Sequence, residues 1–322
     1  RGLGDVYKRQ EGIRAEGYRL QIDRRKILLT AIDSAGLFYG KQTLRQLATA
    51  QGIPCVEVLD NPRFAYRGMH LDVSRHFFPK EQIFKILDEM AYYKLNKFHF
   101  HLCDNGGWRI QIDKYPLLTK LGSHRMEIEW LKWWDFGDKH YVPEDTPGAY
   151  GGYYTKEDIR QIVSYAAGRH IDVIPEIEFP AHSDEVFVGY PEFCCTGRPY
   201  TTGEFCVGNP ATLRFAEDVL TEIMELFPSK YIHIGGDEAR KVAWKSCPKC
   251  QHLAREVGGF EEVQCYMIEH LELFLAEHGR VMMGWDEILK NSLRSSSVPI
   301  SYRGQRGGIE GANRGLNVIM SP

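Results

Sequence analysis

The segment Tyr231–Glu238 reads YIHIGGDE and has the pattern of a short buried strand that runs into a turn carrying two carboxylates. Neighbouring side chains on a regular strand point to opposite faces, so Asp237 and Glu238 can face one ligand only where the chain has begun to turn. Gly235 and Gly236 permit that turn, because glycine reaches backbone conformations that other residues avoid. A solvated acidic turn is the alternative, but it explains neither the paired glycines nor their place at a strand end.

This strand is one of seven short apolar runs that alternate with helical patterns from residue 64 onward. Repeated strand–helix units indicate a parallel sheet, and the lack of a GxGxxG motif after the first run argues against a dinucleotide-binding sheet. Polar residues gather just after the strands, which favours an α/β fold of the (β/α)8 TIM-barrel type. With seven strands in the sequence, we expect this barrel to lack its last strand. The predicted strands are Gly68–Val73, Lys97–Leu102, Asp172–Ile177, Tyr231–Gly235, Arg280–Trp285, Pro299–Tyr302 and Asn317–Met320.

Three helices between these strands have clear signals. Asn209 and Pro210 supply an N-cap and a proline at the first helical position. Thr155 and Asp158 form a near capping box ahead of an apolar stripe, and a third helix is predicted from about Glu261 to His278.

Residues 11–62 have a different pattern, which we interpret as the C-terminal part of a non-catalytic α/β domain. We expect the catalytic barrel to follow at 63–322 and to be incomplete at its C-terminus. Asp60-Asn61-Pro62 is the predicted linker. The predicted elements are strands at Tyr18–Asp23 and Lys26–Ala31 and a helix from Ser34 to about Thr49, with Leu37, Leu44 and Leu47 on one face.

The composition is that of a globular protein with a large core: 43% of the residues are hydrophobic, 26% are charged, and the net charge is -3. No block of Lys and Arg stands out, so we predict no nucleic-acid partner. No apolar run reaches the length of a membrane span. Residues 1–10 lack the apolar core of a signal peptide, and the compartment and the oligomeric state stay open.

Eight cysteines are present. Cys247 and Cys250 have the spacing of half a zinc ribbon, with His252 nearby, but no second CxxC pair follows. We therefore predict no metal site and no cofactor, and read the pair as structural or redox-active. A disulfide among Cys194, Cys195 and Cys206 is a further prediction, with the pairing left open.

The active site of such a barrel lies where strands end and βα-loops begin. Those positions hold many carboxylates with an Arg, His residues and aromatic side chains, a set that suits glycoside hydrolysis. Metal-assisted hydrolysis is an alternative, because His99 and His101 face the same side of a strand; interior histidines bonded to carboxylates are the simpler interpretation. The collected residues are Asp72, Arg75, His99, His101, Asp104, Asn105, Glu176, Glu178, His182, Asp237, Glu238, Trp285, Asp286 and Glu287.

Six motifs in order make the likeness to a family specific. HIGGDE, YRGMHLDVSRHFF from Tyr66, KLNKFHFHLCDNGGWR from Lys94, VIPEIEFPAHS from Val173, GWDEIL from Gly284 and the stretch from Tyr302 onward resemble the family 20 glycoside hydrolases. The resemblance implies a β-N-acetylhexosaminidase, a retaining exo-glycosidase that removes terminal β-linked GlcNAc or GalNAc with the substrate's acetamido group as nucleophile. It also suggests a periplasmic, secreted or lysosome-like location.

The resemblance assigns roles by motif position. Glu238 is the expected general acid and base, and Asp237 the residue that orients the acetamido group. Asp104 and His182 are expected to support Glu238. Arg75 is expected to hold sugar hydroxyls, and Trp285 and Tyr302 to line the acetamido pocket, so the expected partner is a carbohydrate with a terminal N-acetyl-hexosamine.

The sequence also departs from the family. Asn105-Gly106 stands where relatives usually carry Asp-Gln, Ala181 replaces a usual Gly, and Tyr302 occupies a position commonly held by Trp. An acetamide-gripping Tyr after the seventh strand, and a Trp and a Glu near the eighth, have no counterpart. A sugar-binding or inert barrel fragment therefore remains an alternative to an active enzyme.

Overall fold

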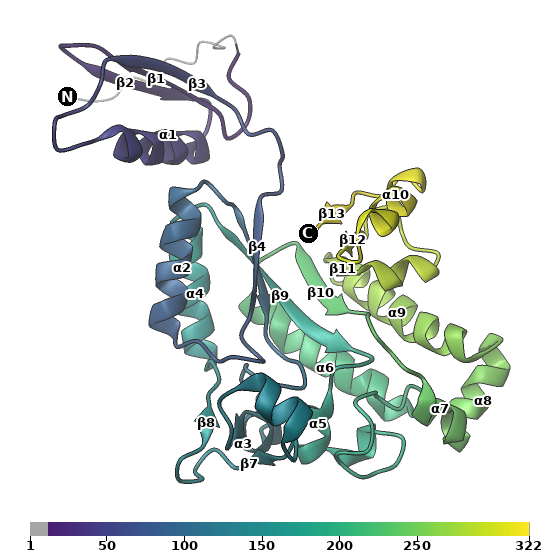
Figure 1. The fold of residues 1–322 in the computed structure, drawn as a ribbon. Coiled ribbons are helices and arrows are strands. Elements are labelled where there is room, and N and C mark those ends of the chain that lie inside the picture. Colours follow the sequence, from purple (N-terminus) through teal and green to yellow (C-terminus); the bar gives the residue numbers. More distant parts are fainter. Residues whose placement is uncertain (1–11, 322) are drawn as a thin grey trace. The chain divides into compact units, whose positions relative to one another are not determined.

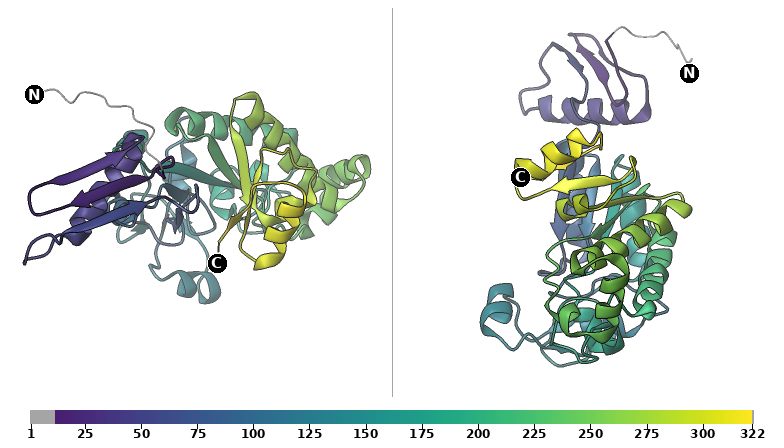
Figure 2. Two further views of the ribbon diagram at one scale, coloured as in Figure 1. Left: turned by 90° about the horizontal axis from the view of Figure 1, so that it is seen from above. Right: turned by 90° about the vertical axis from the view of Figure 1, so that its right-hand side faces the viewer.

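The computed structural model describes residues 12–321, which form two compact units (Figures 1 and 2). The first unit contains the chain up to Met69 together with Phe84–Lys97 and Tyr165–Asp172. The second unit contains His70–Ile83, Phe98–Ser164 and the chain from Val173 onward.

The first unit begins with a three-stranded antiparallel sheet in which β1 (Tyr18–Ile22) lies between β2 (Ile27–Ala31) and β3 (Val56–Asp60). Helix α1 (Ser34–Leu47) packs on this sheet. Both predicted strands and the helix are confirmed. Strand β3 was not predicted, and Asp60, expected in a linker, is its last residue.

Helix α1 packs with part of the predicted leucine face. Leu44 and Leu47 pack against the sheet, whereas Leu37 is 40% exposed, and Tyr39, which was not predicted, is buried. The contact face contains Gly36 and Gly40, and a Cβ on Gly40 would lie 2.3 Å from Cδ1 of Leu29. The two glycines let the helix backbone lie close to the sheet, so the buried face contains them together with Leu44 and Leu47 and leaves Leu37 outside.

The main sheet has seven strands in the order β13-β12-β11-β10-β9-β5-β4, and the pairs from β9 to β13 are parallel. Every strand predicted for the barrel is present, so the α/β barrel-type fold is confirmed. Among residues 12–321 the sheet is open between β13 and β4. The strands are β4 (Gly68–Asp72), β5 (Lys97–His101), β9 (Asp172–Phe179), β10 (Tyr231–Gly235), β11 (Val281–Trp285), β12 (Val298–Ser301) and β13 (Ile319–Met320).

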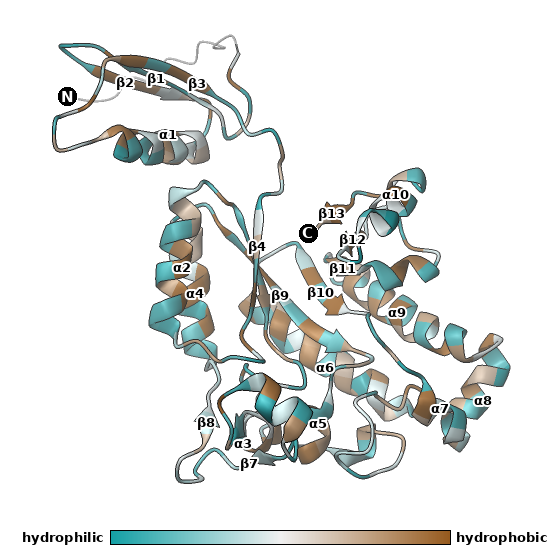
Figure 3. Ribbon diagram, viewed as in Figure 1, coloured by the Kyte–Doolittle hydropathy of each residue, from teal (hydrophilic) through white to brown (hydrophobic). Residues whose placement is uncertain are grey.

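Helices connect the strands, and α6 and α9 lie side by side against one face of the sheet (Figure 1). Asn209 caps α6, with its side-chain oxygen accepting from Ala211 N at 3.3 Å, as predicted. Strands β9 and β10 and helices α6 and α9 all carry both hydrophilic and hydrophobic residues (Figure 3). The helices have this mixture as expected for elements buried on one side. The longer helices are α2 (Lys80–Tyr92), α4 (Lys156–Ala167), α6 (Pro210–Leu226), α8 (Pro248–Val257), α9 (Phe260–Glu277) and α10 (Gln305–Asn313).

The connection from β5 to α4 holds a small sheet that was not predicted, formed by β6 (His124–Arg125), β7 (Tyr141–Val142) and β8 (Tyr150–Gly151). Short helices complete the described chain: α3 (Leu117–Gly122), α5 (Asp184–Gly189) and α7 (Val242–Ser246), with η1 (Lys132–Phe136), η2 (Pro191–Phe193) and η3 (Asp286–Lys290). None of the helices described is long and apolar enough to cross a bilayer.

Candidate active site

The chain turns sharply at the end of β10, as its glycines predicted. Gly235 and Gly236 have φ angles of 70° and 94°, and Glu238 itself has a φ of 49°. The Gly236 N–H donates to Phe179 O at 2.9 Å, and the Gln264 side chain donates to Gly236 O at 2.9 Å. These two bonds fix the backbone of the turn directly before Asp237 and Glu238.

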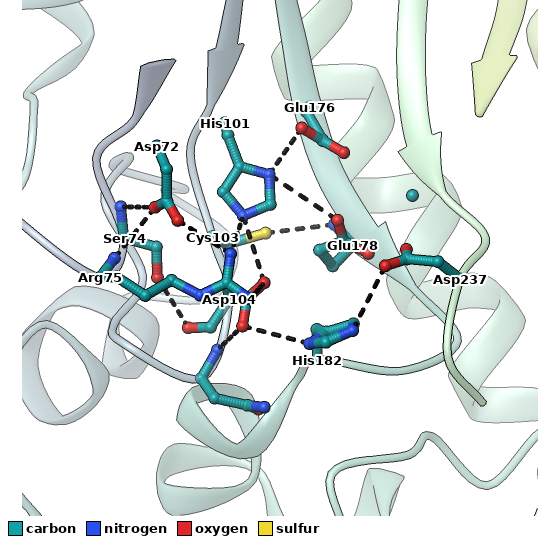
Figure 4. Close-up of polar contacts among 12 residues, drawn as sticks. Asp72, Ser74, Arg75, His101, Cys103, Asp104, Glu176, Glu178, His182 and Asp237 are labelled. Carbon is teal, nitrogen blue, oxygen red and sulfur yellow. Dashed lines mark hydrogen bonds and ion pairs between the residues drawn. The ribbon is translucent and has the colours of Figure 1, made fainter. Parts of the chain in front are cut away.

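His182 links three of the predicted site carboxylates, and Figure 4 shows its contacts with two of them, Asp104 and Asp237. Its Nδ1 lies 3.3 Å from Asp104 Oδ1, and its Nε2 lies 3.3 Å from Asp237 Oδ2 and 3.5 Å from Glu238 Oε2. Burial alone would lower the pKa of His182, but Asp104 and Asp237 raise it to about 11. His182 is therefore a cation at neutral pH, held between a buried carboxylate and the two carboxylates that follow β10.

Asp104 lies at the centre of the charged network. Arg75 Nη2 lies 2.6 Å from Asp104 Oδ2, and Arg75 Nη1 contacts Asp72 Oδ2 at 2.8 Å. Burial would raise the pKa of Asp104, but His182 and Arg75 hold it well below its usual value. Arg75 keeps 31% of its side chain exposed, so part of the guanidinium remains open to a ligand.

Histidines from β4, β5 and β10 surround one buried carboxylate. Glu176 Oε2 lies 2.6 Å from His101 Nδ1, 2.9 Å from His99 Nε2 and 3.4 Å from His70 Nε2, and Glu176 Oε1 lies 2.8 Å from His233 Nδ1. His99 and His101 do face one side of the strand, and both contact this carboxylate, as the simpler interpretation predicted. Despite burial, His101 and its neighbours hold the pKa of Glu176 well below its usual value.

Glu178 lies two residues further along β9, and its pKa is shifted in the opposite direction from that of Glu176. Burial, with the nearby carboxylates of Asp237 and Glu176, raises its pKa well above the usual value. The absence of a side chain at Gly235 makes room for it, because a Cβ there would lie 1.9 Å from Glu178 Oε2. Its surroundings therefore favour the protonated form of Glu178 beside Asp237.

Trp285 and Tyr302 form the aromatic side of the site, with ring centroids 5.1 Å apart. The Tyr302 hydroxyl donates to Glu287 Oε1 at 3.1 Å, and Arg303 Nη1 lies 3.1 Å from the same oxygen. Burial raises the pKa of Tyr302, and Glu287 and Asp237 raise it further, so its hydroxyl keeps its proton.

Two buried arginines that the sequence did not mark frame the loops after β4 and β5. Arg109 donates to the carbonyls of Ser74 and Gly106 at 2.6 and 3.0 Å. Arg125 donates to Gly106 O and to Arg75 O, each at 2.7 Å. Arg109 closes the NGGWR motif, which was the available signal, whereas nothing in the sequence distinguishes Arg125 from a surface arginine.

Comparison with known proteins places this geometry in a family. The model of the catalytic domain of glycosyl hydrolase family 20 matches residues 64–322, and the model of domain 2 of the same family matches residues 2–61. A beta-hexosaminidase of Porphyromonas gingivalis is 41% identical over 331 residues, covering 96% of this chain and 40% of the relative. A beta-hexosaminidase of Vibrio furnissii is 36% identical over 340 residues, covering 100% of this chain and 54% of the relative.

Solved structures agree. The exo β-N-acetylglucosaminidase of Vibrio harveyi, in complex with N-acetylglucosamine, matches with a TM-score of 0.85 and 31% identity over 96% of this chain and 50% of that one. The β-N-acetylhexosaminidase of Bacteroides fragilis matches with a TM-score of 0.82 and 32% identity over 95% of this chain and 60% of that one. The chain spans about half the length of the curated relatives it matches. The resemblance seen in the motifs is confirmed, and the chain belongs to glycosyl hydrolase family 20.

Proposed function

We propose that this protein is a retaining exo-β-N-acetylhexosaminidase that uses the acetamido group of its substrate as the nucleophile. The observation that carries the proposal is the contact of one histidine cation, His182, with Asp104 on one side and with Asp237 and Glu238 on the other. The barrel at 63–322 is the proposed catalytic domain, and 11–62 the proposed non-catalytic one.

In the first step Glu238 donates a proton to the glycosidic oxygen. The acetamido carbonyl oxygen attacks the anomeric carbon, the bond to the leaving group breaks, and an oxazolinium-type intermediate forms. Glu238 suits this role because its side chain is 62% exposed, on the open side of the turn. Asp237, only 13% exposed, accepts the acetamido N–H and stabilises the positive charge that develops on that nitrogen.

In the second step the carboxylate of Glu238 takes a proton from water, and the water oxygen attacks the anomeric carbon. This opens the ring intermediate and restores the acetamido group with retention of configuration. His182 keeps Asp237 and Glu238 in place through both steps. Arg75 binds sugar hydroxyls with its exposed edge, and Trp285 and Tyr302 line the pocket of the acetamido methyl group.

The substrate class is a glycan with a terminal β-linked N-acetyl-hexosamine. The Vibrio harveyi relative is described in complex with N-acetylglucosamine, which supports this sugar as the occupant. The aromatic pair at Trp285 and Tyr302 offers an apolar surface to the methyl group of an N-acetyl substituent. A plain hexoside has a hydroxyl group in that position and would not use this surface.

Glu238→Gln tests the acid role, because it keeps the shape of the side chain and removes the proton. Turnover of a β-GlcNAc disaccharide should fall about 10²–10⁴-fold, whereas a nitrophenyl β-GlcNAc, whose leaving group needs little acid assistance, should lose much less. Glu277→Gln, at an exposed glutamate near the end of α9, is the matched control and should leave both rates unchanged. Equal losses for the two substrates would remove Glu238 from this role.

A further inference from the structure

Four cysteines from two distant parts of the sequence meet in the second unit. Cys195 and Cys206 flank the loop that follows η2, and Cys247 and Cys250 open helix α8. The Sγ–Sγ distances are 3.7 Å for Cys195–Cys250, 3.6 Å for Cys206–Cys247 and 3.7 Å for Cys206–Cys250. All four sulfur atoms lie within 4.8 Å of one another, and three of the four residues are buried.

These distances match one particular geometry. Four thiolates bound to a tetrahedral zinc ion at about 2.3 Å stand about 3.75 Å apart. Directly bonded sulfur atoms would stand about 2.05 Å apart, little more than half the distance found. A set of four soft sulfur ligands in a compact tetrahedron is typical of zinc or iron.

The surroundings favour the thiolate form. The Gly208 N–H donates to Cys250 Sγ at 3.4 Å. Cys247 is the N-cap of α8, where the positive end of the helix dipole stabilises a thiolate. Gly208 lies so close to α8 that a Cβ would stand 2.4 Å from the carbonyl carbon of Lys249, so the two segments are built for close approach.

We propose that Cys195, Cys206, Cys247 and Cys250 bind one structural zinc ion. The four ligands fill a tetrahedron and leave no position for water, so the ion would have no part in the chemistry. His252 is not a ligand, because it is exposed and pairs with Glu256 on the same helix.

The zinc would fasten together two loops that carry the site. The segment before Cys206 bonds to the loop of His182: Phe205 N donates to Pro180 O at 2.8 Å, and Ser183 N donates to Gly203 O at 3.1 Å. The same segment bonds to the chain after Glu238, because Lys241 N donates to Glu204 Oε1 at 2.9 Å and the Trp244 indole donates to Phe205 O at 2.8 Å. The four cysteines are therefore positioning residues for His182 and for the turn of Asp237 and Glu238.

Elemental analysis of the whole chain, purified without a polyhistidine tag and dialysed against a weak chelator, tests the proposal. About one zinc per chain is expected. Cys206→Ser and Cys250→Ser should each reduce bound zinc at least about tenfold. Cys265→Ser, at a half-buried cysteine outside the cluster, is the matched control and should keep its zinc. Zinc retained in Cys250→Ser, or iron in place of zinc, would overturn the assignment.

A second measurement on the unaltered protein covers the case in which the serine variants do not fold. A thiol-specific mercurial should release the zinc as about four equivalents react. Cobalt exchanged into the site should give the intense visible absorption of a tetrahedral thiolate complex. A protein without metal would refute the proposal. This holds whether a thiol count on the denatured protein finds all eight cysteines free or finds four of them lost to disulfides.

Activity provides a separate readout that rests on the proposed function. Removing zinc should lower kcat for a β-GlcNAc substrate more than it changes KM, because the loops of His182 and Glu238 lose their common anchor, and restoring zinc should rescue the rate. Full activity in zinc-free protein would contradict the positioning role. An inactive protein that nevertheless holds one zinc per chain would count against the proposed function alone.

Discussion

Asp104→Asn is the change that most directly probes the charge network. Asp104 faces Nδ1 of His182 at 3.3 Å and is 2% exposed, so the substitution removes a buried negative charge while keeping the shape of the side chain. The carboxylate of Asp237 then remains the main group that favours the charged form of His182, and burial opposes it.

The size of the effect follows from the distance. Two unit charges 3.3 Å apart interact by about 5 kcal/mol at an effective dielectric constant of about 20, which corresponds to about 3–4 pKa units. The pKa of His182 should therefore fall from about 11 to about 7–8 in the variant. Since a single partner of a buried ion pair is removed, the free energy of unfolding should also drop by about 3–5 kcal/mol.

The sign of the pH dependence follows from the raised pKa. A group whose pKa is higher in the folded state stabilises the fold fully below its unfolded value, about 6.5, and that stabilisation is lost as the pH rises toward 11. In Asp104→Asn the loss should be complete by about pH 8. The unaltered protein should therefore keep a charged His182 through pH 9, and the variant should not.

The assay is the pH profile of kcat/KM on a β-GlcNAc substrate, with the titration of His182 followed by NMR of a histidine-labelled sample. The variant should lose activity between about pH 7 and 8, where its His182 deprotonates. Asp138→Asn, next to exposed His140 at 3.8 Å, is the matched surface pair and should change neither readout. A His182 titration that stays above pH 10 in Asp104→Asn would refute the electrostatic reasoning.

Three further substitutions test the framework of the site. Gly235→Ala should lower the melting temperature and reduce turnover, because the φ of 70° at this position disfavours a side chain and the new Cβ would collide with Glu178. We expect a stability loss of about 2 kcal/mol or more, and an unchanged melting temperature would contradict this prediction. Glu176→Gln should destabilise the fold at neutral pH, because it leaves the charged His101 without its closest carboxylate. Calorimetry at pH 7 measures the effect, and a variant as stable as the parent would count against the ion pair. Gly40→Ala should destabilise the first unit by contact with Leu29 while kcat of folded protein stays within about twofold; a large fall in kcat would show that this unit influences the site.

The strands and the site turn could be predicted because their signals are local. The apolar runs that became β4, β5 and β9 to β13 alternate with helices over short distances, and the paired glycines at 235 and 236 are required by their own backbone angles. Strand β3 was missed because only alternate side chains of its five residues are partly buried, which leaves a weak apolar signal. Leu37 of α1 was wrongly placed on the buried face, because two glycines form part of the contact and carry no apolar side chain that would mark it.

The detailed contacts among the site residues could not be derived from the sequence. Asp104, His182 and Asp237 follow β5, β9 and β10, which are neighbours in the sheet in chain order, so the predicted barrel brings their loops together. Which of their side-chain atoms meet depends on the conformations of the loops, and the apolar pattern does not specify those. The cysteine cluster shows the same limit. A CxxC pair without a second CxxC argued against a metal, whereas the fold brings two single cysteines, 11 residues apart, onto that pair.

The states of Glu176 and Glu178 show how the fold decides what neighbouring acids can do. Both side chains come from β9 and are buried, yet the pKa of Glu176 is lowered by histidines and that of Glu178 is raised by burial and by Asp237. The raised pKa favours the neutral form of Glu178, which avoids a second negative charge beside Asp237. The neutral form therefore suits a site in which Asp237, next to the His182 cation, is proposed to stabilise positive charge on an acetamido nitrogen. The protonation of the buried acids thus contributes to the proposed chemistry together with the position of Glu238.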